Sequence, residues 1–468
     1  MWMIPQLPSA GGATLWLAAF GEQRPADLVI VDLESWRGRD ERGFTPAWKP
    51  LREDDAFGLW YARVELTGLL PDERYALWIR PGGGARFGAP AQIRTLPSRL
   101  PGPRDAPFVM MLGSCFDFRG TGGPAIADFR RVLADYRFPH LKILCGDQIY
   151  LDLPVTESIP HEPAELFRFL LGKYLRNWAP EGAPLASGFG SLLRHGANLL
   201  VTDDHEFWNN YPFAAAHVPF TYSSSRRRLL GRLSQAFIRA FQIDYAADDA
   251  QARGLTEITI GEPGAPGGLE IFAIDGRFDR SETLAHWPRA IARLCERLRG
   301  LRSPAMVVLS QPLFEIAQSA LKRRFVDAGL PDLEDYDSLA EALASAPRDV
   351  MILSGDIHNG RIAQLRAGLG VRAGGDRKIV EVVASPLSLI PGTKYYDSAC
   401  HDAFPSRPLL RGFRAVPRGV EMVVGPLLTD HAVVLEVTAK DRCVEASASF
   451  WSIGERRLIQ EPTVITLT

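Results

Sequence analysis

The 468-residue sequence lacks most of the features that mark specialised classes of protein. Its five cysteines, at positions 115, 145, 295, 400 and 443, are scattered and odd in number. That argues against a disulfide framework and fits a reducing compartment. No apolar run is long enough to span a bilayer. The first residues lack the basic and apolar regions of a signal peptide, so we expect a cytoplasmic protein with no membrane span.

A strong charge of either sign is also missing. The sequence holds 53 Lys and Arg against 55 Asp and Glu, a formal net charge of −2. No global field would therefore attract nucleic acid or an anionic membrane, and no nucleic-acid-binding surface is evident. There is no internal repeat and no low-complexity tract. A hydrophobic content of 46% is ordinary for a globular protein, and the length predicts two domains.

Residues 1–96 alternate short apolar and polar stretches between turns rich in Gly, Pro and Asp. A period of two over such stretches predicts a β-sandwich of the fibronectin or immunoglobulin type. The segment 66–75 resembles the tyrosine corner of these domains, in which the Tyr75 hydroxyl would bond to nearby backbone. A stiff, proline-rich linker follows at 97–106 and leads into a second domain at 107–468.

The second domain contains short apolar segments that predict buried strands, and each of them ends in polar side chains. The ends are Ser-Cys at 114–115, Gly-Asp-Gln-Ile-Tyr-Leu-Asp at 146–152, Asp-Asp-His-Glu at 203–206, Asp-Gly-Arg at 275–277, Ser-Gln-Pro at 310–312 and Ser-Gly-Asp-Ile-His at 354–358. Helices are predicted at about 124–136, 163–178, 225–243, 282–299 and 338–346. This order predicts an α/β domain whose polar side chains gather at one edge of one sheet.

Each polar group has an ordinary explanation when taken alone. Cys115 is typical of a small buried apolar residue, His205 of a satisfied core imidazole, and Asp356 of a turn. Carboxylates, a thiol and a phenol that converge on one edge are harder to explain in this way. Like charges would repel one another unless a cation lay among them. The sequence therefore predicts a metal site.

In order and spacing, these motifs resemble the PhoD-like (alkaline phosphatase D) branch of the calcineurin-like metallophosphatases, over about residues 110–390. The resemblance implies a four-layer α/β/β/α sandwich with an N-terminal β-domain and two metal ions at the sheet edge. It implies that Asp147 bridges both ions. The first ion would also take Cys115, Tyr150 and His358, and the second would take Asp204 and Asp356.

The donor types predict which metals would bind. A thiolate and a phenolate on one ion suit Fe³⁺, and an oxygen-rich neighbour suits Ca²⁺. We therefore expect a binuclear centre of Fe³⁺ plus Ca²⁺, with Mg²⁺, Mn²⁺ and Zn²⁺ as alternatives. Gln311 falls roughly where the superfamily has a further histidine, and Asp203 and Asp152 are candidates for roles behind the ligands.

The function implied is hydrolysis of phosphomonoesters, phosphodiesters or both, by a PhoD-like alkaline phosphatase or phosphodiesterase that uses a metal-bound hydroxide. His205 would protonate the leaving alcohol or hold a phosphoryl oxygen. Arg277 would add positive charge at the phosphate, with a structural salt bridge as its alternative. The partner would be a small-molecule or polymer phosphate ester.

Two other functions fit part of the pattern. A non-catalytic, metal-stabilised binding module would need the aspartates but would give His205 no role. A two-carboxylate glycosidase would need the carboxylates but neither the cysteine nor the tyrosine beside them.

Overall fold

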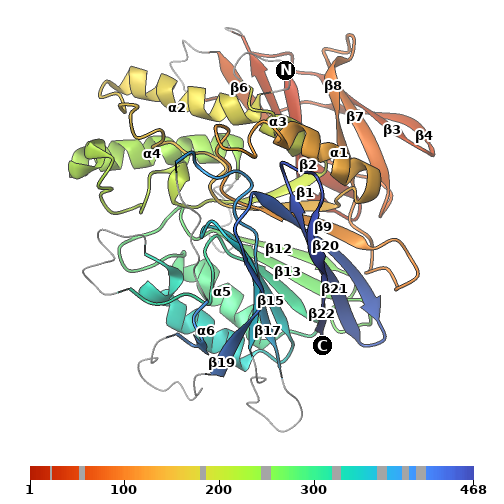
Figure 1. Ribbon diagram of the computed structural model, residues 1–468. Coiled ribbons are helices and arrows are strands. Elements are labelled where there is room, and N and C mark those ends of the chain that lie inside the picture. The colour runs from red at the N-terminus through yellow and green to blue at the C-terminus, as the bar shows by residue number, and fades with distance from the viewer. Residues whose placement is uncertain are drawn as a thin grey trace.

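The computed structural model describes residues 1–21, 24–51, 58–179, 186–243, 254–318, 328–365, 377–392, 400–406 and 418–468. These residues form three sheets and two groups of helices (Figure 1). None of the described helices is long and apolar enough to cross a membrane.

The largest sheet has ten strands in the order β22-β21-β20-β9-β10-β11-β1-β2-β6-β5. Its central strands β9, β10 and β11 are parallel, and every residue of the three is buried because both faces of the sheet are covered here. The bounds are β1 Trp2–Ser9, β2 Gly12–Phe20, β5 Lys49–Pro50, β6 Leu59–Leu66, β9 Phe108–Gly113, β10 Leu141–Cys145, β11 Ala197–Val201, β20 His431–Lys440, β21 Cys443–Ser452 and β22 Leu458–Leu467.

The second sheet has eight strands in the order β12-β13-β14-β15-β17-β16-β19-β18. Strands β13, β14, β15 and β17 are parallel to one another. The bounds are β12 Leu255–Ile260, β13 Leu269–Ile274, β14 Ala305–Val308, β15 Val350–Ser354, β16 Gly360–Leu365, β17 Ile379–Val383, β18 Ala403–Phe404 and β19 Arg418–Leu427.

The two large sheets pack face to face, and alternate residues of each strand point to different layers. In the first sheet, Leu112 and Ile143 join the core between the sheets, whereas Met111 and Leu144 join the core under the helices. Helices α2 and α4 pack in one core with the first sheet, and α5 and α6 pack in another core with the second sheet. Figure 1 shows α2 and α4 at the upper left and α5 and α6 at the lower left. The predicted four-layer α/β/β/α sandwich is confirmed.

The helices follow the apolar stripes of the sequence. The structure has α1 Ile126–Tyr136, α2 Pro163–Trp178, α3 Phe189–Leu193, α4 Ser224–Phe241, α5 Pro288–Arg299 and α6 Asp335–Ser345. The α2 prediction is confirmed, with a proline in the first turn and a buried stripe. Helix α5 begins later than the predicted residue 282 because Pro288 opens it, and α6 begins earlier than the predicted residue 338, at Asp335.

The third sheet, β4-β3-β7-β8, faces β1, β2 and β6 across a separate apolar core. Its bounds are β3 Val29–Ser35, β4 Gly38–Phe44, β7 Arg74–Pro81 and β8 Phe87–Arg94. The Leu70 N–H donates to the Tyr75 hydroxyl at 3.0 Å, so the predicted tyrosine corner is confirmed. This N-terminal sandwich shares its second layer with the ten-stranded sheet, because β1 pairs in parallel with β11 through Gln6 and Asn198. The division at residues 97–106 therefore remains a sequence-based proposal.

Candidate metal centre

The predicted site residues lie at the carboxyl ends of strands from both large sheets, not of one sheet as the sequence predicted. Strands β9, β10 and β11 belong to the first sheet and β13, β14 and β15 to the second. Two glycines allow their end loops to meet. A Cβ on Gly146 would lie 2.4 Å from the Asp203 Cβ, and a Cβ on Gly355 would lie 2.4 Å from the Ser114 Cβ. The one-sheet expectation was wrong because strand periodicity does not say which sheet a strand joins.

Four of the predicted ligands have left-handed backbone conformations. The φ angles are 55° for Cys115, 55° for Asp147, 72° for Asp356 and 53° for His358. Side chains other than glycine rarely adopt such angles, and each costs on the order of 1–3 kcal/mol. Backbone strain of this kind is common at functional sites, where it aims a side chain that a relaxed backbone would direct elsewhere.

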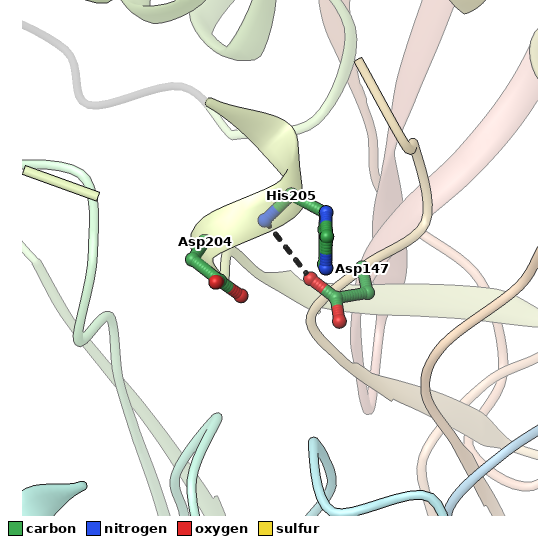
Figure 2. Close-up of side chains that lie close together, drawn as sticks. All are labelled: Asp147, Asp204 and His205. Atoms are coloured by element: carbon green, nitrogen blue, oxygen red, sulfur yellow. Dashed lines mark hydrogen bonds between the residues drawn. The ribbon is translucent and has the colours of Figure 1, made fainter. Parts of the chain in front are cut away.

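The carboxylates form the centre of the site. One oxygen each from Asp147, Asp203, Asp204 and Asp356 lie within 4.8 Å of one another. A second group joins Asp147 and Asp204 to a ring nitrogen of His205 within the same limit. Figure 2 shows Asp147, Asp204 and His205 close together, with the His205 backbone N–H donating to the Asp147 carboxylate at 3.2 Å. Asp147 and Asp204 belong to both groups.

His205 is held from behind by Asp152. The His205 Nδ1 lies 2.7 Å from Oδ1 of Asp152, a side chain with no exposed surface. The other oxygen of Asp152 lies 3.0 Å from Nε2 of His217 and accepts the Asn209 N–H at 2.9 Å. Sequence reasoning identified Asp152 only as a residue behind the ligands and missed His217. The only signal for His217 was its place in the loop after the Asp-Asp-His-Glu motif.

Cys115 and Tyr150 lie together on the other side of Asp147. The Cys115 Sγ is 3.5 Å from Oδ2 of Asp147, and Cys115 packs with Tyr150 and Leu153 in one small buried cluster. The Ser385 hydroxyl donates to Cys115 Sγ at 3.2 Å and accepts the His358 N–H at 3.1 Å. These contacts bring Cys115, Tyr150 and His358 to one side of the carboxylates.

Arg277 and Gln311, the remaining predicted residues, contact the carboxylates of the site from behind. Arg277 has no exposed surface, and its guanidinium donates to the Asp203 carboxylate and, at 3.0 Å, to the Tyr211 carbonyl. This is the geometry that a structural salt bridge requires, and contact of Arg277 with phosphate stays a prediction. Gln311 Nε2 donates to Oδ2 of Asp356 at 3.1 Å and so orients a predicted ligand.

Glu206 holds the loop that carries Asp147. Its buried carboxylate accepts backbone N–H groups from Asp147, Gln148, Ile149 and Asp203 at 2.6–3.3 Å. Burial nevertheless raises the pKa of Glu206 to about 8. Glu206 was the last letter of the Asp-Asp-His-Glu motif, and its role behind the site could not be predicted from spacing alone.

Burial and the close approach of several acidic groups change the pKa values of the site residues. Burial raises the pKa of Asp147 well above its usual range, and neighbouring Cys115 and Asp204 raise it further. Burial, with a contribution from Asp356, raises the pKa of the Cys115 thiol to about 12. Burial alone would lower the pKa of His205, but the carboxylates of Asp152 and Asp204 outweigh it and raise that pKa well above 6.5. A cation among these groups would favour their anionic forms.

The residues present fit a pair of cations. Oδ1 of Asp204 is buried and has no hydrogen-bond partner among the described residues. Buried polar atoms without a partner are rare and call for an explanation such as a bound ion. Burial, followed by the positive charge of His205, lowers the pKa of His358 to about 4, which keeps its imidazole in the neutral form that binds metals.

Solved structures resemble this chain over nearly all of its length. PhoD is 14% identical, with a TM-score of 0.61, and the match covers 98% of this chain and 92% of PhoD. The chain has the metallophosphatase fold. A purple acid phosphatase from yellow lupin (Lupinus luteus) seeds is 9% identical, with a TM-score of 0.57, and the match covers 100% of this chain and 74% of that protein. No protein-family model and no curated protein matches the sequence. The resemblance to PhoD-like metallophosphatases is thus confirmed in the fold.

Proposed function

We propose that the protein is a metal-dependent phosphoesterase of the PhoD-like type, acting on phosphomonoesters, phosphodiesters or both. The observation that carries the proposal is the group of three buried carboxylates, Asp147, Asp203 and Asp204, with the partly buried Asp356 and with His205 beside them, at the carboxyl ends of strands in a metallophosphatase fold. Carboxylates of this number and proximity suit divalent and trivalent cations.

Two ions bound by these residues would stabilise charge on the phosphoryl oxygens and supply a water of lowered pKa. Asp147 would hold both ions, Cys115, Tyr150 and His358 would hold the first, and Asp204 and Asp356 would hold the second. The thiol and the phenol favour Fe³⁺ at the first position, and the oxygen donors favour Ca²⁺ at the second.

The chain itself supplies an acid for the leaving group. His205 presents one ring nitrogen to the carboxylate group, while Asp152 accepts from the other at 2.7 Å. Asp152 therefore fixes the tautomer and orientation of His205 and favours its cationic form. A cationic imidazole in that place can protonate the departing alkoxide of a phosphate ester. Arg277 would act through Asp203, which it holds beside the carboxylates.

The test is hydrolysis of p-nitrophenyl phosphate and bis-p-nitrophenyl phosphate by the full chain, with the metal content measured on the same sample. Turnover should stop with a chelator and return on addition of iron and calcium. The ratio of the two rates would distinguish a monoesterase from a diesterase. A protein that binds the metals in stoichiometric amount yet hydrolyses neither ester would refute the proposal and favour the non-catalytic metal-binding module.

A pair of matched variants tests whether the activity depends on bound metal. Asp356→Asn removes a charge within the carboxylate group, whereas Asp72→Asn removes one at the far end of β10, where Asp72 pairs with His140 at 2.8 Å. The first variant should lose metal and activity together, and the second should keep both. Activity that survives metal loss in Asp356→Asn would contradict a metal-dependent reaction.

A further inference from the structure

Three arginines lie together at the amino ends of adjacent parallel strands, at the opposite edge of the second sheet from the metal centre. Arg302 precedes β14, Arg348 precedes β15 and Arg377 precedes β17. These strands are neighbours in the order β14-β15-β17. In register, Ala305 pairs with Val350 and Val350 pairs with Ile379. Arg348 and Arg377 therefore stand at the same level of the sheet, with Arg302 one residue further out.

These arginines line a hollow of about 470 Å³, together with Gly264, Leu301 and Pro347. Arg348 and Arg377 are half-buried, and Arg302 is exposed. None of the three guanidinium groups forms a hydrogen bond or an ion pair with any residue in the described parts of the chain. Like charges on neighbouring strands destabilise a sheet unless an opposite charge lies between them.

The carboxylate that follows Arg348 in the chain is already engaged. Asp349, between Arg348 and β15, is buried, and its carboxylate accepts the Lys378 N–H at 2.8 Å and the Thr468 N–H at 2.8 Å. By contrast, Arg297 and Arg361 of the same domain are paired with carboxylates, at 2.9 Å from Glu270 and at 3.1 Å from Glu381. The arginines of the hollow thus differ from Arg297 and Arg361 in having no carboxylate partner among the residues that the structure describes.

We propose that this hollow is a second anion site, which binds an inorganic oligophosphate chain such as tripolyphosphate. Guanidinium groups bind phosphate oxygens in a planar, two-pronged geometry. Adjacent strands are about 4.8 Å apart, so the backbones of the outer two arginines are separated by roughly 10 Å, which suits an elongated anion better than a single phosphate. Among the described residues, the lining contains no aromatic ring to stack a nucleobase and no acid to bind a cation. The site does not depend on the phosphoesterase function.

Isothermal titration of tripolyphosphate into the full chain tests the proposal. Arg348→Gln and Arg377→Gln should each weaken binding by roughly tenfold or more, and the double variant should abolish it, because each removes a charge-assisted hydrogen-bond donor. Arg293→Gln is the matched control, since Arg293 is also partly exposed but pairs with Glu257 at 2.6 Å. This control should bind as the unmodified chain does. Thermal unfolding of each variant checks that it is folded.

The metal centre is a competing place for the same anion. Asp147→Asn alters that centre and leaves the hollow intact, so tripolyphosphate should still bind to this variant at the arginine site. Binding that disappears in Asp147→Asn and persists in the double arginine variant would assign the anion to the metal centre and overturn the proposal. Equal affinity for orthophosphate and tripolyphosphate would contradict the proposal that the site prefers an elongated anion.

Discussion

Replacement of Asp152 by asparagine should separate catalysis from metal binding. The substitution keeps the size of a side chain that has no exposed surface but removes its charge. Asp152 does not belong to either group of residues that could hold a metal, so the metal content should stay unchanged. What changes is the partner of His205: an amide can present its NH₂ to Nδ1, which would then have to be unprotonated.

The size of the effect follows from the contact that is lost. The bond between His205 Nδ1 and Asp152 Oδ1, at 2.7 Å, is a charge-assisted hydrogen bond when His205 is cationic. Such bonds contribute about 1.5–3 kcal/mol, and at 1.36 kcal/mol per factor of ten this corresponds to a fall in kcat of about 10- to 160-fold. Asp152 also raises the pKa of His205. Without it that pKa is lower, so the loss of activity with rising pH should begin at a lower pH.

The assay is the pH dependence of kcat for p-nitrophenyl phosphate hydrolysis, with iron and calcium measured on each preparation. Asp72→Asn is the matched control because Asp72 also accepts from a histidine, His140, but lies at the other end of β10. A residue acting through His205 should change kcat more than KM. His217→Gln removes only the 3.0 Å contact to the second oxygen of Asp152, so it should have a smaller effect in the same direction.

Two results would refute this reasoning. If Asp152→Asn keeps kcat within about threefold with metals intact, His205 does not need its carboxylate partner, because that loss is below the weakest charge-assisted bond. If metal is lost in proportion to activity, Asp152 acts on the metal centre and not through His205.

Further variants test the ligands, the domain arrangement and the pH dependence of stability. Asp147→Asn should lose bound metal and nearly all activity, and stoichiometric metal with normal turnover would contradict a bridging role. Fe³⁺ with phenolate and thiolate should give the concentrated protein a visible absorption band that shifts or fades in Tyr150→Phe; an iron-free, colourless protein from iron-replete medium would exclude that assignment. A chain that begins near residue 105 should be poorly soluble, because it exposes the β11 edge that β1 now pairs with, and a soluble, fully active truncation would contradict this. His431 is buried, donates from Nδ1 to the Thr429 carbonyl at 2.6 Å, and has its pKa lowered to about 4 by burial. The unfolded chain therefore takes up a proton first, and this group should reduce the free energy of unfolding by roughly 1.4 kcal/mol per pH unit from pH ~6.5 down to ~4. Denaturant unfolding of His431→Gln should show a shallower pH slope, and an unchanged slope would contradict the assignment.

Much of the fold could be predicted because the apolar pattern is strong. Helix α2 has a proline at its start and a continuous buried stripe, and its bounds match the predicted 163–178. The tyrosine corner at Tyr75 could be predicted because its hydrogen bond joins Tyr75 to Leu70, a residue close to it in the sequence. The first residues of α5 and α6 were harder to predict, because a polar segment before a helix and a polar first turn of the helix have similar sequences.

The site was predicted in its members but not in its geometry. Polar side chains after apolar strands identified Asp147, Asp204 and Asp356, because strand ends gather side chains at an edge. The sequence could not indicate that two sheets contribute, nor that Asp152 lies between His205 and His217, since these contacts join segments far apart in the chain. The left-handed backbone of Cys115 and His358 was likewise invisible, because any residue type can be forced into it by its surroundings.

The order of strands in the largest sheet has a consequence for synthesis of the protein. Strand β9 lies beside β20, where Leu112 pairs with Val433, and β20 is made long after β9 during translation. Until then, the growing chain presents an unpaired strand edge next to the loop that carries Cys115. Exposed edges of this kind recruit other chains, and contacts between distant segments form slowly. Nascent chains that stop before residue 431 should therefore need a chaperone to stay in solution.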